Sequence, residues 1–148
     1  MQNGSNGRES SPVTRPRLLV VEDDPEMREF LTDTLTGEGF LTDAAGDGAE
    51  ALIRLRAQPF AAVLLDKNMP GLSGLDLLPS LRTMCPNTPI ILTTAFGDAE
   101  TEREAATKGA YGYLPKPFST QSLLAAIRRA LEPHDFVAPS PSTPGGSA

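Results

Sequence analysis

The sequence has 148 residues, and its 19 acidic and 13 basic side chains give a formal net charge of −6 at pH 7. This length accommodates one domain with a sizeable core, and the acidic balance argues against a general binder of the nucleic-acid backbone. The single cysteine, Cys85, excludes an internal disulfide, and no apolar run reaches the length of a membrane span or of a signal segment. We therefore expect a cytoplasmic protein.

Both ends of the chain have the composition of disordered tails. Residues 1–14 are rich in Gly, Ser and Asn, and residues 133–148 are rich in Pro, Ser and Gly. Neither stretch shows hydrophobic periodicity. The pattern predicts one folded domain over residues 15–132.

Within this domain, short apolar segments alternate with amphipathic ones. The predicted strands are 17–21, 40–45, 61–65, 89–93 and 110–114. Each is followed by a helix, and the N-caps of the five predicted helices are Asp24, Asp47, Ser73, Asp98 and Ser119. Five strands alternating with five helices predict an α/β fold, a doubly wound parallel sheet covered on both faces.

The apolar spacing predicts which side of each helix faces the sheet. In the first helix Phe30 is expected to lie on the buried face with Leu31, and in the second helix Ala49 and Ile53 are expected to point inward. The fourth helix offers only alanines as apolar residues. It should bury little area and be the most loosely held element.

Polar residues stand where the predicted strands end. The first strand is followed by Glu22 and Asp23, the third by Asp66, the fourth by Thr94 and the fifth by Lys116. The carboxyl ends of parallel strands meet at one edge of a sheet, so these side chains should converge there. Clustered carboxylates need a cation, and oxygen ligands without His or Cys indicate Mg²⁺. A carboxylate beside Mg²⁺, a lysine and a hydroxyl suits phosphoryl transfer with the carboxylate as nucleophile.

Four motifs give the sequence a specific resemblance. Val-Val-Glu-Asp-Asp, Leu-Leu-Asp-Lys-Asn-Met-Pro-Gly, Thr-Ala and Gly-Tyr-Leu-Pro-Lys-Pro-Phe occur in this order between residues 17 and 132. Together they resemble the motifs of receiver domains of two-component response regulators, including stand-alone receivers of the chemotaxis type. The resemblance implies a flavodoxin-like sheet of strand order 2-1-3-4-5 with five helices.

The resemblance also implies a role for each residue of the motifs. Asp66 would be the phosphoacceptor, with Thr94 and Lys116 as the catalytic residues that contact the phosphoryl group. The Mg²⁺ ligands would be Asp23 directly, Glu22 through water, Asp66, and the backbone carbonyl of Asn68.

Two further roles follow from the same resemblance. Thr94 and Tyr113 would form a switch that is read out through the face made by the fourth helix, the fifth strand and the fifth helix. Asn68 and Phe96 would control the access of the hydrolytic water. Because Phe96 offers no hydrogen bond and a large ring, the phosphorylated form should lose its phosphoryl group slowly.

The expected function is therefore a phosphoaccepting receiver that acts on no separate substrate. Its partner would be a histidine kinase or a histidine phosphotransfer protein, without direct contact to nucleic acid or membrane. A phosphorylation-dependent dimer is left open.

The main alternative is the receiver part of a larger DNA-binding transcriptional regulator. A phosphatase of the haloacid-dehalogenase type is disfavoured, because such an enzyme would carry Asp-x-Asp and a cap domain. A docking module that is never phosphorylated is disfavoured by the complete acceptor site.

Overall fold

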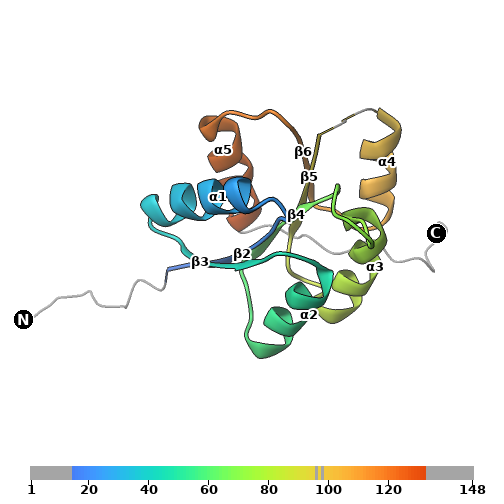
Figure 1. The fold of residues 1–148 in the computed structure, drawn as a ribbon, viewed down its shortest axis with the longest axis horizontal. Coiled ribbons are helices and arrows are strands. Elements are labelled where there is room, and N and C mark those ends of the chain that lie inside the picture. Colours follow the sequence, from blue (N-terminus) through green and yellow to red (C-terminus); the bar gives the residue numbers. More distant parts are fainter. Residues whose placement is uncertain (1–14, 96, 98, 133–148) are drawn as a thin grey trace, which may run out of the picture.

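The computed structural model describes residues 15–95, 97 and 99–132. These residues form a five-stranded sheet flanked by five helices (Figure 1). The strands are β2 (Arg17–Val21), β3 (Leu41–Ala45), β4 (Ala62–Asp66), β5 (Ile90–Thr94) and β6 (Gly112–Pro115). The helices are α1 (Pro25–Gly37), α2 (Gly48–Ala57), α3 (Gly74–Met84), α4 (Ala99–Thr107) and α5 (Thr120–Leu131). The predicted tails and the predicted cap Asp98 lie outside the described residues.

The sheet has the strand order β3-β2-β4-β5-β6, and every neighbouring pair is parallel. This confirms the predicted doubly wound fold and the order 2-1-3-4-5. The register aligns the strand ends, since Val21 pairs with both Ala45 and Leu65, and Asp66 pairs with Thr93. The carboxyl ends of the central strands therefore lie at one edge.

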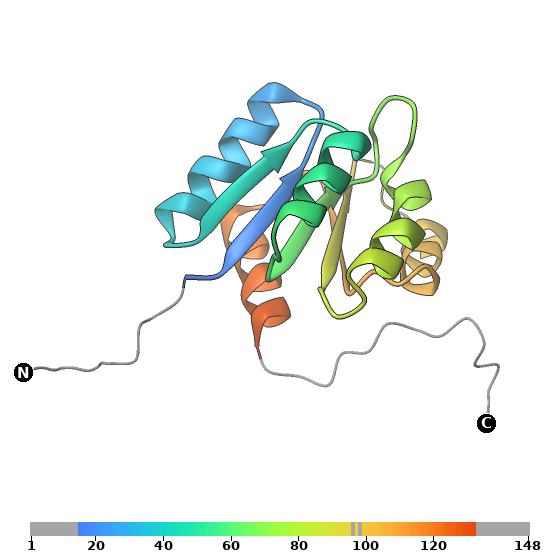
Figure 2. The ribbon, with the colours of Figure 1, turned by 90° about the horizontal axis from the view of Figure 1, so that it is seen from below.

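Helices cover both faces of the sheet (Figure 2). One core cluster joins the sheet to α2, α3 and α4, and the other joins it to α1 and α5. Along β2 the side chains alternate between the clusters: Leu18 and Val20 lie in one, Leu19 and Val21 in the other. A strand that is buried on both faces has to be apolar throughout, which explains the continuous apolar runs in the sequence. No helix among the described residues is long and apolar enough to cross a membrane.

Four of the predicted N-caps are confirmed. The side chains of Asp24, Asp47, Ser73 and Ser119 each accept a hydrogen bond from the backbone N–H three residues later. Each cap satisfies a backbone donor that the first helical turn leaves without a partner. The caps also fix the points at which the loops at the sheet edge turn into helices.

Three residues that were predicted to face inward are exposed, although Leu31 and Leu35 of α1 are buried as predicted. Phe30 is 48% exposed and Ile53 is 62% exposed, and Ala49 is exposed as well. The buried residues of α2 are instead Gly48 and Ala51. These small residues let α2 pack closely, because a Cβ at Gly48 would lie 3.4 Å from the methyl groups of Leu77 in α3. The buried stripe of α2 is therefore set by small residues, which apolar periodicity alone undervalues.

Four strands begin later than predicted, β3, β4 and β5 by one residue and β6 by two. Hydrogen bonds account for the start of β3 and of β6. The N–H of Phe40 donates to Leu35 O, and the N–H of Ala110 donates to Ala105 O. Both groups therefore close the end of the preceding helix and are not available to the sheet. As a result β3 begins at Leu41, and β6 begins only at Gly112.

The thin packing of α4 is confirmed, since its buried residues are Thr101 and Ala105.

At the edge of the sheet where the strands begin, the buried Arg82 of α3 donates hydrogen bonds to the carbonyl oxygens of Cys85, Thr88 and Gly109. Burial lowers the pKa of this guanidinium below its usual value. Arg82 thus holds the turn after α4 against the turn after α3.

Candidate functional site: an acidic cluster at the carboxyl edge of the sheet

Three carboxylates converge where β2 and β4 end. Glu22, Asp23 and Asp66 each place one carboxylate oxygen within 4.8 Å of the others'. Glu22 is 1% exposed and Asp66 is 2% exposed, whereas Asp23 is partly exposed. The cluster therefore opens to solvent on the side of Asp23.

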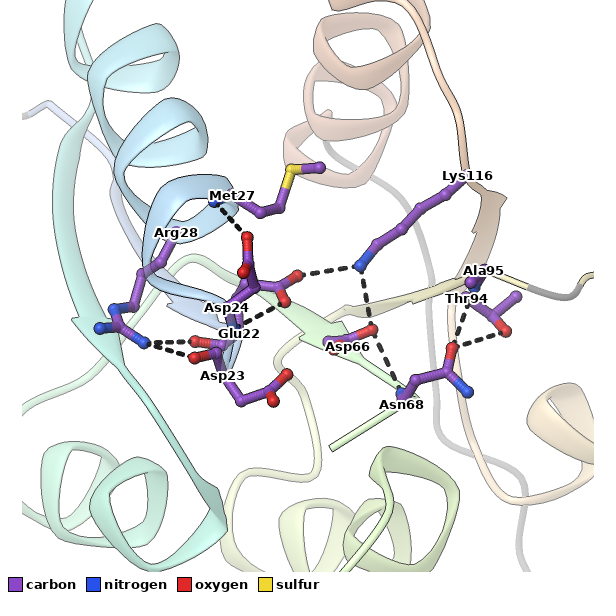
Figure 3. A network of polar contacts seen from close by, with 10 residues as sticks. All are labelled: Glu22, Asp23, Asp24, Met27, Arg28, Asp66, Asn68, Thr94, Ala95 and Lys116. Atoms are coloured by element: carbon purple, nitrogen blue, oxygen red, sulfur yellow. Dashed lines mark hydrogen bonds and ion pairs between the residues drawn. The ribbon is translucent and has the colours of Figure 1, made fainter. Parts of the chain in front are cut away.

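The loop that carries the acidic pair is held from α1 (Figure 3). Nη1 of Arg28 donates to the backbone oxygens of Glu22, at 2.8 Å, and of Asp23, at 3.3 Å. The N–H of Asp24 donates to Glu22 Oε2 at 3.2 Å. Arg28 was not predicted as part of the site, because its contacts are to backbone oxygens, which leave no pattern in the sequence.

Lys116, which follows β6, links two of the acids. Its Nζ donates to Glu22 Oε1 at 3.1 Å and to Asp66 Oδ1 at 3.3 Å. Burial disfavours its charge, but the hydrogen bond to Glu22 and the negative charges of both partners outweigh burial and raise the pKa of Lys116. Lys116 is therefore a fixed cation beside the Asp66 carboxylate.

The electrostatics of Glu22 show that the acids repel one another. Burial, followed by the negative charge of Asp66, raises the pKa of Glu22 above 4.5, and the contact with Lys116 only partly opposes this rise. A single ammonium thus leaves the three carboxylates short of positive charge. An additional cation at the cluster would relieve the repulsion.

Asn68 connects the acceptor strand to the end of β5. Its N–H donates to Asp66 Oδ1 at 3.2 Å, and its Oδ1 accepts hydrogen bonds from Thr94 Oγ1 at 3.2 Å and from the N–H of Ala95 at 2.9 Å (Figure 3). Thr94 is fully buried. In this structure it is joined to Asp66 through Asn68.

Glycine allows α3 to begin directly beside the acceptor. A Cβ at Gly74 would collide with the backbone oxygen of Asp66, so no residue with a side chain fits there. The N–H of Gly74 donates to Lys67 O at 3.0 Å and closes the loop between β4 and α3. Gly71 in the same loop has a φ of +79°, a conformation that favours glycine.

Tyr113 lies on β6, partly buried against the core cluster shared with α3 and α4. A Cβ at Gly97 would lie 2.9 Å from its Oη, so the ring reaches the loop between β5 and α4. The predicted switch residue is therefore close to the segment that follows Thr94. Phe96, the other residue assigned to water access, lies outside the described residues.

The donor set fits a hard divalent cation. The cluster of Glu22, Asp23 and Asp66 offers oxygen atoms only, and two of its members are buried with an excess of negative charge. Mg²⁺ prefers such oxygen ligands and is usually held by one or two carboxylates together with water. The residues present thus fit the predicted Mg²⁺ and give no indication of a metal that prefers nitrogen or sulfur.

The family follows from a comparison with known proteins. The sequence profile of the response regulator receiver domain matches residues 18–128. The chain belongs to the response regulator receiver domain family. The matched segment of the receiver domain runs from β2 into α5 and includes all the site residues described above.

Relatives of the receiver domain include longer regulators. It is 44% identical over 123 residues to the transcriptional activator protein PfeR of Pseudomonas aeruginosa, a match that covers 78% of this chain and 40% of PfeR. It is also similar to the chemotaxis protein CheY4 of Vibrio cholerae, with a TM-score of 0.76 and 31% identity, covering 80% of this chain and all of that one. Similarity extends to the response regulator TrrA of Thermotoga maritima, solved in complex with Mg²⁺ and beryllofluoride, with a TM-score of 0.72 and 34% identity, covering 78% of this chain and 99% of that one.

Proposed function

We propose that the receiver domain is a signalling switch in which Asp66 accepts a phosphoryl group from a phosphohistidine on a histidine kinase or a histidine phosphotransfer protein. The observation that carries this proposal is the placement of Asp66. Its carboxylate ends the central strand β4, is 2% exposed, and lies 3.3 Å from the ammonium of Lys116 and within 4.8 Å of two further carboxylates.

In the transfer, one bond to phosphorus forms as another breaks. An Asp66 carboxylate oxygen forms a bond to phosphorus while the bond between phosphorus and the imidazole nitrogen breaks. The electron pair of the broken bond stays on the imidazole, which then takes up a proton. Lys116 neutralises charge on the transferred group, and the Thr94 hydroxyl donates a hydrogen bond to it.

Mg²⁺ is the proposed cofactor. Glu22, Asp23, Asp66 and the backbone carbonyl of Asn68 would hold it, in line with the oxygen-only cluster. When bound, Mg²⁺ neutralises negative charge on the phosphoryl oxygens. The proposed domain does no chemistry on a separate substrate, so it is a switch and not an enzyme in the usual sense.

The proposed output surface is the face of α4, β6 and α5. On phosphorylation Thr94 moves towards the phosphoryl group and Tyr113 turns into the space beside it. The thin packing of α4, with Thr101 and Ala105 as its buried residues, lets that helix shift at low cost. A cytoplasmic location remains part of the proposal.

A second candidate is the receiver part of a DNA-binding transcriptional regulator. It is supported by the similarity to PfeR, a transcriptional activator of which the chain spans only 40%. In that case the phosphorylation chemistry is the same and the output is transmitted to another domain. The net charge of −6 disfavours DNA contact by the receiver domain itself. Reading the gene on both sides of the coding segment separates the two candidates.

The proposal is tested by incubation with acetyl phosphate and Mg²⁺ followed by intact mass measurement. Wild type should gain about 80 dalton, the mass of one phosphoryl group, and chelation of Mg²⁺ should suppress the gain. Asp66→Asn should show no gain. A matched control is Asp33→Asn, which alters an exposed aspartate on α1 and should be phosphorylated like wild type. A full yield of the adduct on Asp66→Asn would refute the assignment.

A further inference from the structure

The side-chain oxygen of Asn68 accepts hydrogen bonds from two donors at the site. This oxygen, Oδ1, accepts from Thr94 Oγ1 at 3.2 Å and from the N–H of Ala95 at 2.9 Å, while the backbone N–H of Asn68 donates to Asp66 Oδ1 at 3.2 Å (Figure 3). The backbone donor of Ala95 fixes the orientation of the carboxamide, because an NH₂ group cannot accept a hydrogen bond. One residue thus bridges the acceptor carboxylate and the end of β5.

The hydroxyl of Thr94 and the N–H of Ala95 form what we call the donor pair. Two donors that converge on one oxygen beside a reactive carboxylate make an anion-binding arrangement. Lys116, 3.3 Å from Asp66, adds a positive charge on the same edge of the sheet. The donor pair is therefore suited to an anionic oxygen, yet in this structure it binds the neutral amide oxygen of Asn68.

We infer that the Asn68 side chain stands in for a phosphoryl oxygen, occupying the donor pair in the unphosphorylated domain and leaving it when Asp66 is phosphorylated. This inference rests on the proposed function. The exchange is favourable once a phosphoryl group is present, because hydrogen bonds to an ionised oxygen are roughly twice as strong as those to a neutral one. Without it, the amide oxygen satisfies both donors and holds Thr94 in its resting position.

Asn68 is thereby a positioning residue that opposes activation. An anion has to compete with the Asn68 oxygen for the donor pair. The apparent affinity for the anion is therefore its intrinsic affinity multiplied by the fraction of time for which the donor pair is free. The loop position of Asn68 makes the exchange inexpensive, since its side chain is exposed and belongs to neither core cluster. This role precedes phosphorylation and differs from the control of the hydrolytic water, which follows it.

The test uses beryllofluoride, a phosphoryl mimic, at a Mg²⁺ concentration that saturates each variant. Asn68→Ala removes the competing oxygen and keeps the backbone carbonyl. If the donor pair of wild type is free about one-tenth of the time, Asn68→Ala should bind beryllofluoride about tenfold more tightly. Asn68→Asp is the matched control, because it keeps the shape and the accepting oxygen; it should bind no more tightly than wild type.

A spectroscopic readout shows whether the effect passes through the donor pair. Without beryllofluoride, the Ala95 amide proton of Asn68→Ala should resonate upfield of its wild-type position and exchange faster with water, because its acceptor is gone. With beryllofluoride the two proteins should show the same Ala95 signal. In a Thr94→Val background, Asn68→Ala should increase the affinity for beryllofluoride by only about threefold. Thr94→Val has already removed one of the two coupled hydrogen bonds that the Asn68 oxygen accepts.

Equal or weaker beryllofluoride binding by Asn68→Ala would overturn the inference and leave the proposed function intact. So would tighter binding with an unchanged Ala95 signal in the free protein. If wild type itself binds no beryllofluoride in saturating Mg²⁺, the proposed function fails, and the inference that rests on it fails too.

Discussion

Replacing Asp66 by asparagine should stabilise the metal-free domain. The change removes two repulsions, with Glu22 and Asp23, and one attraction, with Lys116. The carboxylate oxygens lie within 4.8 Å of one another, and at this upper limit each repulsion is worth about 0.9 kcal/mol in water and about 3.5 kcal/mol at an effective dielectric constant of about 20. At 3.3 Å the attraction is worth about 1.3 and about 5 kcal/mol under the same conditions.

Even at this upper limit of separation the two repulsions together exceed the attraction, so Asp66→Asn should raise the free energy of unfolding by at least about 0.5 to 2 kcal/mol. The assay is urea denaturation at neutral pH in the presence of a chelator, with Asp33→Asn as the control for loss of one acidic charge elsewhere. Mg²⁺ should reduce the advantage of the variant, because the metal stabilises the intact cluster more. A loss of stability by more than about 1 kcal/mol in metal-free buffer would show that the ion pair with Lys116 dominates and would refute the reasoning.

The pH dependence provides a second check on the same cluster. The pKa of Glu22 is raised above 4.5 in the folded domain, so the folded state binds this proton more tightly than the unfolded state. Glu22 therefore lowers the stability of wild type as the pH rises from 4.5 through its raised pKa. Because the negative charge of Asp66 contributes to the raised pKa of Glu22, stability should fall less with rising pH in Asp66→Asn than in wild type. An identical slope in both proteins over this range would show that burial alone shifts the pKa of Glu22.

Three further predictions concern the metal, the output face and the lifetime. Mg²⁺ at about 100 times its dissociation constant should stabilise wild type by about 2.7 kcal/mol in thermal melts, and Asp23→Ala should lose this gain; an equal gain would place the metal elsewhere. Phosphorylation should change amide exchange in residues 95–118, and changes confined to residues 25–57 would contradict the proposed output face. Phe96→Glu should speed the loss of the phosphoryl group in Mg²⁺ buffer by about tenfold, equivalent to about 1.4 kcal/mol in the barrier, and unchanged decay would remove Phe96 from the control of water access.

The strand ends were the part of the site that the sequence predicted best. A parallel sheet leaves little choice about which residues meet at its edge, so placing Asp66 after an apolar run was enough to bring it near Glu22 and Lys116. Contacts to backbone atoms could not be predicted in the same way. Arg28 holds the carbonyls of the acidic loop, and Arg82 binds three carbonyls while remaining buried. A charged residue on a helix is otherwise expected to be solvated, and neither arginine has a sequence pattern that marks its carbonyl partners.

The inward faces of the helices were predicted less well, for a related reason. Apolar periodicity places Ile53 inside, but α2 packs through Gly48 and Ala51, whose small size matters more than their hydropathy. The contact from Asn68 to Thr94 and Ala95 was also missed, because it depends on the path of one loop rather than on the strand order. Topology was thus predictable from the pattern, whereas close packing and loop contacts required coordinates.

The central claim, that Asp66 accepts the phosphoryl group, is tested most directly by locating the acyl phosphate. The protein is phosphorylated with acetyl phosphate in Mg²⁺ and reduced with borohydride, which converts the phosphorylated aspartate to homoserine, and its peptides are then sequenced by mass spectrometry. We predict homoserine at position 66 and unmodified aspartate at position 23. Homoserine at position 23, or at any aspartate outside the acidic cluster with position 66 unmodified, would contradict the account.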